Sequence, residues 1–494
     1  MYKRIAVILA LSILMISSCS KIDNINILVS SKVEDVISDK STNNPVTTQN
    51  INSSTTPNNS VISVYSSNSS SKAISSNNNS SSTSTSSNEN SSSASTSSRA
   101  PIRPPGATVP SPMAELEVVI NITPQITYVP QYDYSANIKA IFYTGMDYKG
   151  NPTRVFAYIG FPTGASSSNK VPAVVCVHGG GGMAYGEWVQ KWIDNGYAAI
   201  AMDTYGNMPS KTGYLVTSFT RDLQGAAPYD AFARINDPIN QQWPFYTISD
   251  AILANTILLN DDHIQKDNIG LTGVSWGGIF TGITAGVDYR FAFVIPVYGC
   301  GYLNEAQTYF KYYYQNKKIE DYWDVSKYLP FVTMPILWIN GDSDGAFPLN
   351  SFSKTAENTK DSANVIKHLL VHGPIQGWSQ NEIYSFANSI CKGGNPLTKI
   401  VNQPTKSMGK NVNFDVYVPN GVQIVMVIAY YISVPLAYNT QSVNTNTWST
   451  VLGSYSAGKV SVTLPDGVNS YYVNIATTDN FTTIISSTLL INLT

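Results

Sequence analysis

One serine stands where the sequence predicts a sharp turn from a strand into a helix. The apolar run 269–274 ends at Ser275, and Gly273 and Gly277 flank the serine in the pattern G-x-S-x-G. Apolar residues at helical spacing follow from Ile279. Only small neighbours let a strand and a helix cross so closely, and the strained central residue then projects above the sheet. The pattern predicts a nucleophilic hydroxyl, and the alternative is a glycine-rich turn with an incidental serine.

A serine hydroxyl needs a general base, and the chain contains four histidines. His178 opens a glycine-rich loop, where we expect it to stabilise the turn, and His263 lies in a polar surface connection. His368 and His372 both follow the serine in the order that such sites require. Because a strand is predicted over 365–371, His368 should lie within it and His372 in the loop at its carboxyl end. We favour His372 as the base.

Two aspartates compete to be the acid that orients the imidazole. The strand predicted over 335–339 leads into a loop with Asp342 and Asp344. Asp342 lies nearer the strand and could simply cap the turn, whereas Asp344 lies farther into the loop and reaches an imidazole more easily, so we favour Asp344. The loop partly matches a calcium-binding pattern. A strand precedes it, however, and Ser351 stands where a bidentate glutamate is needed, so no metal site is predicted.

Backbone amides on two loops should stabilise the oxyanion that develops on the substrate. One donor is expected to be the N–H of Trp276, directly after the serine. The other should come from the glycines after His178, most plausibly Gly180 or Gly181, because glycine lets the backbone approach the reacting carbonyl closely. Taken alone, the glycine run would be no more than a flexible connection between a strand and a helix.

The segments that would position these groups alternate between buried strands and amphipathic helices. Strands are predicted over 172–177, 197–202, 269–274, 291–297, 335–339 and 365–371, and helices over 187–195 and 247–259. This alternation indicates an α/β fold with a doubly wound, mostly parallel sheet, and ligands bind beyond the carboxyl ends of such strands. Residues 115–162 have extended character, with Leu116, Val118 and Ile120 alternating, and are predicted to form antiparallel strands at one edge.

The two ends of the chain differ from this central part. After residue 394, apolar and alternating segments are separated by turns, and no helical stretch appears, so a small C-terminal β-sandwich is predicted over 395–494, after a catalytic domain over 113–394. A long insertion over 206–244 lacks clear periodicity and is placed to roof the site.

The N-terminus is predicted to anchor the protein. Lys3 and Arg4 precede a short apolar run, and small residues lead to Cys19, so 1–18 is predicted to be a lipoprotein-type signal peptide with Cys19 acylated. The alternative is an ordinary signal peptide with a chance cysteine. Residues 20–112, rich in Ser, Asn and Thr, should form a disordered tether. We expect a protein of the cell envelope that contacts the membrane only through its lipid and faces the periplasm or the exterior.

The net charge argues against a nucleic-acid partner, and the cysteine spacing argues against a disulfide framework. The formal net charge of −2 over 494 residues gives no reason to expect nucleic acid as a partner. Cys176, Cys300 and Cys391 have no regular spacing, so buried free thiols are predicted and a disulfide framework is not.

Taken together, the motifs resemble those of the α/β-hydrolases. Within that fold they are similar to bacterial acetyl xylan esterases and dienelactone hydrolases, which border on the prolyl oligopeptidase catalytic domain. The resemblance covers about 138–391 and is carried by 177–182, 273–278, 341–348 and by His372 with the Gly377-Trp378 pair after it. It implies Ser275 as nucleophile, Asp344 as acid and His372 as base, with no metal or organic cofactor.

Aromatic side chains in the loops around the predicted site suggest a substrate pocket with flat apolar walls. They are Tyr185, Trp188, Trp243, Tyr298, Phe347 and Trp378, and each alone could equally be core packing. Such walls suit sugar rings or aromatic acyl groups. The first hypothesis is a serine esterase that removes acetyl or acyl groups from small-molecule or oligosaccharide esters. The alternatives are a serine peptidase resembling prolyl oligopeptidases and an inactive surface-binding lipoprotein.

Overall fold

The computed structural model describes residues 103–209, 215–216, 225–226, 231–438, 446–479 and 481–493. These residues belong to one compact unit, Ser93–Thr494. The predicted signal peptide, Cys19, most of the tether and much of the 206–244 insertion lie outside the described residues. Within that insertion, β6 (Met208–Pro209) pairs antiparallel with β7 (Leu215–Val216).

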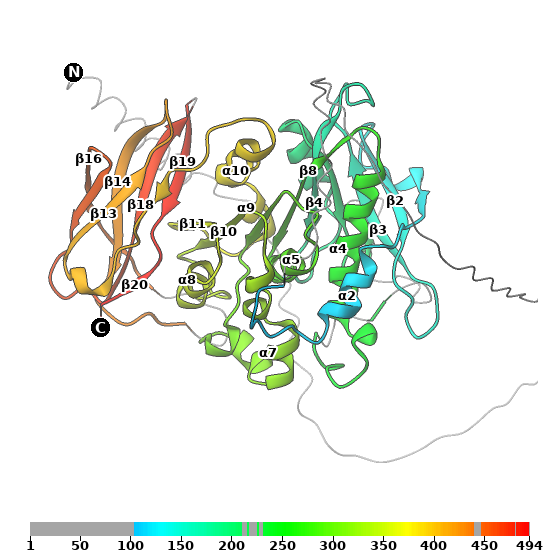
Figure 1. Ribbon diagram of the computed structural model, residues 1–494, viewed down its shortest axis with the longest axis horizontal. Coiled ribbons are helices and arrows are strands. Elements are labelled where there is room, and N and C mark those ends of the chain that lie inside the picture. The colour runs from blue at the N-terminus through cyan, green and yellow to red at the C-terminus, as the bar shows by residue number, and fades with distance from the viewer. Residues whose placement is uncertain are drawn as a thin grey trace, which may run out of the picture. The chain divides into compact units, whose positions relative to one another are not determined.

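A nine-stranded sheet carries the predicted site (Figure 1), in the order β1-β2-β3-β5-β4-β8-β9-β10-β11. Its antiparallel edge consists of β1 (Ile126–Tyr128), β2 (Ile138–Thr144) and β3 (Arg154–Gly160). The parallel strands are β4 (Val171–Val177), β5 (Ala198–Met202), β8 (Ile264–Val274), β9 (Phe293–Val297), β10 (Ile336–Gly341) and β11 (Ser362–Lys367). The predicted doubly wound, mostly parallel sheet is confirmed.

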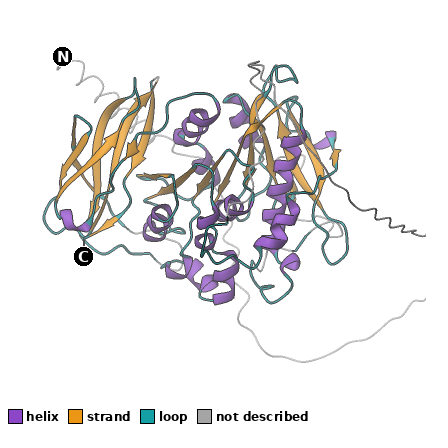
Figure 2. Cartoon of the chain, viewed as in Figure 1, coloured by secondary structure: helices purple, strands orange, loops and turns teal. Residues whose placement is uncertain are grey.

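Helices cover this sheet in two layers (Figure 2). In one layer, α4 (Trp243–Asn260) packs beside α5 (Trp276–Val287) and α2 (Met113–Val119). In the other, α3 (Gly186–Asp194) meets α10 (Asn381–Cys391) through the rings of Trp192 and Tyr384, whose centroids lie 4.9 Å apart. The remaining α-helices among the described residues are α6 (Phe310–Tyr314), α7 (Lys317–Trp323), α8 (Leu349–Glu357) and α9 (Pro374–Trp378). No helix in the described ranges is both long enough and apolar enough to cross a bilayer.

Two predicted segments differ from the structure. Residues 113–119 form α2, although extended structure is predicted there: Leu116 is fully buried while Val118 is 62% exposed, which fits a helical face and contradicts strand alternation. The strand predicted over 365–371 ends at Lys367. Leu369 adopts φ 60°, a left-handed conformation that a strand cannot continue through, so His368 lies in the loop and not in the strand.

The predicted C-terminal β-sandwich is confirmed. One sheet contains β12 (Lys399–Ile400), β13 (Asn411–Tyr417), β17 (Lys459–Thr463) and β16 (Ser454–Ser456). The other contains β15 (Ser449–Leu452), β14 (Gln423–Ile432), β18 (Ser470–Asp479) and β19 (Thr482–Ser487), with β20 (Ile491–Asn492) also paired to β18. Alternate residues of these strands, such as Val412, Phe414 and Val473, fill a separate core.

The sandwich covers the edge of the large sheet, where β19 lies beside β11 (Figure 1). The backbone N–H of Ile366 donates to Ser487 Oγ at 2.8 Å, and Asn474 Nδ2 donates to the carbonyl of Ile366 at 3.0 Å. Asn364 Nδ2 in turn donates to the carbonyl of Ser487 at 3.1 Å. An edge strand otherwise presents unpaired backbone groups, and here sandwich side chains satisfy those of Ile366.

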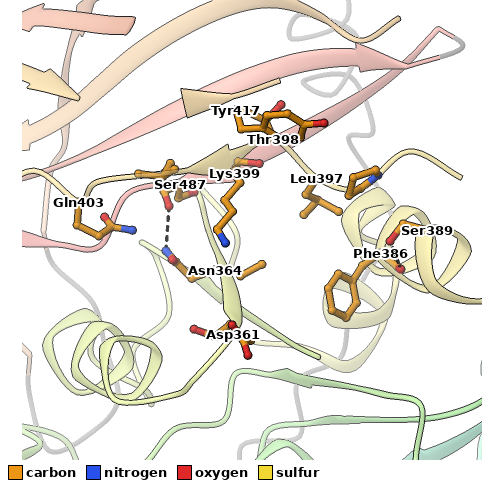
Figure 3. A pocket seen from close by; sticks show the side chains of 15 residues that line it. Asp361, Asn364, Phe386, Ser389, Leu397, Thr398, Lys399, Gln403, Tyr417 and Ser487 are labelled. Carbon is orange, nitrogen blue, oxygen red and sulfur yellow. Dashed lines mark hydrogen bonds between the residues drawn. The ribbon is translucent and has the colours of Figure 1, made fainter. Parts of the chain in front are cut away.

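A cavity of about 300 Å³ remains beside this contact (Figure 3). Asn364 of β11 and Phe386 of α10 line one side of it, and Lys399 of β12 and Tyr417 of β13 line the other. None of its lining residues belongs to the predicted site, so the cavity is separate from the serine and its neighbours.

Candidate active site

Ser275 occupies the turn between β8 and α5 with φ 59° and ψ −122°. A side chain on Gly277 would overlap the carbonyl oxygen of Val177, and one on Gly273 would overlap that of Gly277. Strand and helix therefore cross at the distance that only glycine permits, as predicted. The strained serine is held on both sides, since its N–H donates to the Val297 carbonyl at 2.9 Å and its own carbonyl accepts the N–H of Ile279 at 3.0 Å.

The structure brings Ser275, His372 and Asp344 together. Ser275 Oγ lies 2.9 Å from His372 Nε2, and His372 Nδ1 lies 2.8 Å from Asp344 Oδ2. A carboxylate only accepts hydrogen bonds, so Nδ1 carries a proton and Nε2 is left to accept the serine hydroxyl. Asp344 is fully buried, and its Oδ1 accepts the N–H groups of Ala346 at 2.6 Å and Phe347 at 3.0 Å. These bonds fix the carboxylate and therefore the imidazole.

Two predicted pocket residues pack on the imidazole of His372. The ring centroids of Tyr298 and Phe347 lie 4.9 and 5.9 Å from it, and both side chains are fully buried. Tyr298 also donates its hydroxyl to the carbonyl of Val371 at 2.9 Å. Burial, and then the charge of Asp344, raise the pKa of Tyr298, which keeps this hydroxyl protonated as a donor. Both residues therefore hold the imidazole in place from inside the protein.

The other predicted pocket residues pack mostly within the core. Trp188, Trp243 and Trp378 are buried, and Trp188 stacks on Trp378 at 4.9 Å. Trp243 donates its indole N–H to the carbonyl of Thr204 at 2.9 Å. Tyr185 is half-buried against Trp378 at 5.0 Å. These side chains form the wall behind the site and present little surface to a substrate.

Further aromatic residues, which the sequence reasoning missed, pack around the ring of Trp276. Trp276 is half-buried, and the rings of Phe310 and Tyr313 lie 5.1 and 6.1 Å from its ring. Tyr309 stacks on Phe310 at 4.4 Å. The aromatic run at 309–314, with one lysine, is the signal that could have identified this wall.

The glycine loop lies directly against the serine turn. A side chain on Gly179 would meet Ser275 Cβ at 2.8 Å, and one on Gly180 would meet Trp276 Cδ1 at 2.8 Å. The N–H of Gly181, a predicted oxyanion donor, instead donates to the hydroxyl of Tyr205 at 3.3 Å. This bond occupies the amide of Gly181 and leaves the amide of Gly180 as the candidate oxyanion donor of the two. Trp276 begins α5, so its N–H is among the first amides of a helix, which have no acceptor within the helix.

Tyr205 is a further donor candidate at this position that the sequence reasoning missed. Burial raises the pKa of Tyr205 to about 12. The bond from Gly181 lowers this pKa in part, and the charge of Asp203 raises it further. The hydroxyl thus stays protonated, accepts from Gly181 and retains its own proton for donation.

Hydrogen bonds fix the ring of His178 at the base of the loop. Its Nδ1 lies 2.7 Å from the carbonyl of Gly179, and its Nε2 accepts the N–H of Thr204 at 2.9 Å. A carbonyl can only accept, so the proton is on Nδ1. Nε2 also lies 3.3 Å from Asp203 Oδ1. His178 stabilises the turn, as predicted.

The two competing candidates pair with each other. His368 Nδ1 lies 2.6 Å from Asp342 Oδ2, so each histidine takes a different aspartate from the same loop. The carboxylate of Asp342 is buried, like that of Asp344. Neither Asp342 nor His368 takes the place of its neighbour beside Ser275.

Comparison with known proteins gives one family match and several distant relatives. Residues 233–373 match the prolyl oligopeptidase family. The probable dipeptidyl-peptidase 5 of Aspergillus clavatus is 28% identical over 116 residues, which cover 22% of this chain and 15% of that protein. Dipeptidyl-peptidase 5 of Aspergillus fumigatus is 26% identical over 137 residues, or 26% of this chain and 16% of that protein. The chain thus spans about a sixth of the length of the curated relatives it matches.

Solved structures of esterases and a peptidase are similar to this chain. An acetyl xylan esterase from Paenibacillus sp. R4 is 19% identical with a TM-score of 0.44, and the match covers 55% of this chain and 92% of that one. Acetyl xylan esterase 1 from Thermoanaerobacterium sp. is 18% identical with a TM-score of 0.44, covering 57% and 94%. An acylaminoacyl peptidase from Pyrococcus horikoshii is 16% identical with a TM-score of 0.41, covering 52% and 43%.

Proposed function

We propose that this chain, a serine hydrolase with the α/β-hydrolase fold, is a carboxylic ester hydrolase that removes acetyl or other acyl groups from carbohydrate-type substrates. One observation carries the proposal: Ser275 Oγ, His372 and Asp344 form a continuous hydrogen-bonded chain with steps of 2.9 and 2.8 Å. In that order a hydroxyl, an imidazole and a buried carboxylate make up a nucleophile, its base and the group that orients the base.

In the first half of the reaction, Ser275 Oγ attacks the ester carbonyl carbon while its proton passes to Nε2 of His372. Asp344 holds Nδ1–H and stabilises the imidazolium that forms. The N–H of Trp276, with the N–H of Gly180 or the hydroxyl of Tyr205, supports the oxyanion. When the tetrahedral intermediate collapses, the alcohol oxygen takes the proton from His372 and leaves, and the acyl group stays on the serine.

In the second half, water attacks the acyl carbon and gives a proton to Nε2 of His372. The bond to Ser275 Oγ breaks, the serine recovers its proton, and the carboxylic acid departs. Every proton in this cycle moves through one imidazole nitrogen. The steps need only the residues named, and among the described residues no group of three or more His, Cys, Asp or Glu is arranged to hold a metal ion.

The surroundings of Ser275 support a substrate with flat apolar faces. Trp276 and Tyr309 are half-buried and Tyr313 is 36% exposed, so their rings are partly accessible. Aromatic faces of this kind stack on sugar rings. Purified protein should release acetate from p-nitrophenyl acetate and from acetylated xylo-oligosaccharides, and this release should be absent with Ser275→Ala. If the protein cleaves neither of the two esters, the ester proposal is refuted.

A serine peptidase is the second candidate, supported by the match of residues 233–373 to the prolyl oligopeptidase family. The same triad cleaves amides through the same acyl-enzyme, so its geometry does not separate the two. A proline-containing p-nitroanilide measured beside the acetyl ester does so. A kcat/KM for the amide that equals or exceeds that for the esters would favour the peptidase.

We also propose that acylated Cys19 anchors the protein to the cell envelope, after removal of 1–18, with 20–112 as the tether. The charged start, the short apolar run and the small residues before Cys19 support this. Expressed in a bacterium, the chain should partition into the detergent phase of Triton X-114, and Cys19→Ala should move it to the aqueous phase. Equal partition of both proteins would count against the anchor.

A further inference from the structure

Asp342 joins three parts of the chain at one buried carboxylate. Its Oδ2 lies 2.6 Å from His368 Nδ1 and accepts the hydroxyl of Tyr472 at 2.7 Å. Its Oδ1 accepts the N–H of Leu369 at 2.8 Å. Asp342 and His368 belong to the loops after β10 and β11, whereas Tyr472 belongs to β18 of the sandwich. A residue 130 positions away thus bonds directly to this aspartate.

An aromatic ring of the sandwich also packs on the imidazole of His368. Tyr430 stacks on it with ring centroids 4.3 Å apart, and Tyr472 stacks on Tyr430 at 5.0 Å. The two tyrosines are directly opposite in the pairing of β14 with β18. Trp448 packs edge-on against Tyr472 at 5.1 Å and donates its indole N–H to the backbone carbonyl of Asp342 at 3.4 Å. The sandwich therefore contacts both members of the pair.

These contacts hold the two loops that carry the acid and the base. Asp342 precedes Asp344 by two residues, and His368 precedes His372 by four. Between the histidines, the chain is fixed where Leu369 donates to Asp342, and the hydroxyl of Tyr298 fixes the carbonyl of Val371. The Asp342–His368 pair thus fixes both loops at the end nearer the strands they follow, and Asp344 and His372 lie farther along each loop.

We infer that Tyr472, acting through Asp342 and His368, is a positioning residue for the catalytic acid and base, so that the β-sandwich is part of what makes the site competent. This inference rests on the proposed function. Tyr472 does not reach the reacting atoms; its hydroxyl holds Asp342, and Asp342 holds both loops at their near ends. Because a shift of about 1 Å in a catalytic group can cost about 10²-fold in rate, a loosened loop should slow the chemical step.

The neighbouring residue Tyr471 supplies a matched control. Both tyrosines are fully buried on β18, but Tyr471 points into the sandwich core, and its hydroxyl has no hydrogen-bond partner among the described residues. Tyr472→Phe and Tyr471→Phe remove the same atom from adjacent positions. Only the first removes a bond to Asp342.

The experiment measures kcat and KM on p-nitrophenyl acetate, with the concentration of active serines titrated by a fluorophosphonate. Tyr472→Phe should lower kcat per titrated site about tenfold with KM within twofold, whereas Tyr471→Phe should match the wild type. The titration counts only active enzyme. A purely structural role of Tyr472 would lower the number of active sites and leave kcat per site unchanged.

A second variant tests the same inference through the imidazole. His368→Leu should lower kcat per titrated site as Tyr472→Phe does, and His368→Asn, which keeps a donor near the position of Nδ1, should recover part of the loss. Wild-type kcat per site in both Tyr472→Phe and His368→Leu would overturn the inference. Failure of the proposed function would look different, because the wild type itself would then lack ester turnover that depends on Ser275.

Discussion

The hydroxyl of Ser275 lies 2.9 Å from Nε2 of His372, although 97 positions separate the two residues in the sequence. Ser275 follows β8 and His372 follows β11, with β9 and β10 between these strands in the sheet. Parallel strands present their carboxyl ends at one edge, so loops from different strands can meet there. The contact is therefore a product of strand order.

Removal of the serine hydroxyl should abolish turnover. Ser275→Ala is expected to reduce kcat at least about 10⁴-fold, because members of such a triad act as a unit. Ester hydrolysis measured under saturating substrate checks this, with circular dichroism to confirm that the variant is folded. Turnover within tenfold of the wild type would mean that another residue is the nucleophile.

The strained backbone at Ser275 predicts an unusual order of stabilities. Its φ of 59° is unfavourable for any residue with a Cβ and easy for glycine. Such strain costs about 1–3 kcal/mol, whereas glycine normally destabilises by about 0.5–1 kcal/mol relative to alanine. Ser275→Gly should therefore be more stable than Ser275→Ala by about 1 kcal/mol in urea unfolding. The reverse order would show that the turn is not strained.

Asp344 should matter for the rate more than for substrate binding. Asp344→Asn would present an amide to Nδ1 of His372 and favour the wrong tautomer, so kcat should fall about 10⁴-fold with little change in KM. The surface pair of Asp261 with His263 offers the control. Asp261→Asn should leave kcat unchanged. A fall in kcat of less than tenfold for Asp344→Asn would remove Asp344 from the mechanism.

Sequence reasoning predicted those parts of the site that local chemistry determines. The glycines around Ser275 identify a close crossing, and the loop position of Asp344 follows from where β10 ends. The preference for His372 over His368 rests on a strand over 365–371, but β11 ends at Lys367 and both histidines lie in the loop. The contacts of Asp342 and His368 with the sandwich could not be predicted, because Tyr472 and Tyr430 reach them from a distant part of the chain. The helix at 113–119 was missed because Leu116 and Ile120 fit both a helical and an alternating pattern. Of the predicted pocket aromatics, Tyr298 and Phe347 pack on His372, but how deeply each ring is buried depends on side-chain packing that spacing does not report.

A buried carboxyl away from the site should make stability fall with rising pH. Burial, and then the charge of Asp203, raise the pKa of Asp250 well above its ordinary value of 3.8. At a pH above the ordinary value, the unfolded chain has released this proton while the folded protein still holds it. The free energy of unfolding therefore decreases as the pH rises, until the pH reaches the folded-state pKa. Asp250→Asn removes this dependence.

Urea unfolding at pH 4.5, 6.0 and 7.5 checks this expectation. The stability of Asp250→Asn relative to the wild type should increase from the lowest pH to the highest. Parallel curves for the two proteins would show that Asp250 titrates normally in the folded state.

Two adjacent serines on β19 test the covering of the sheet edge. Ser487 Oγ accepts the N–H of Ile366 at 2.8 Å, whereas the hydroxyl of Ser486, also buried, has no partner among the described residues. Ser487→Ala leaves a buried N–H unsatisfied and should cost about 1–3 kcal/mol of unfolding free energy. Ser486→Ala should change it by less than about 0.5 kcal/mol. Equal effects of the two would mean that the bond to Ile366 contributes nothing.

The covering of β11 by the sandwich also has a consequence for biosynthesis. Ser487 is made 121 residues after Ile366, so a growing chain completes its large sheet long before the segment that shields the last strand exists. Throughout that interval the strand offers bare amides and carbonyls to any neighbouring polypeptide. The nascent protein is therefore most prone to associate with other chains while this strand is uncovered, and folding of 395–494 against the sheet ends that exposure.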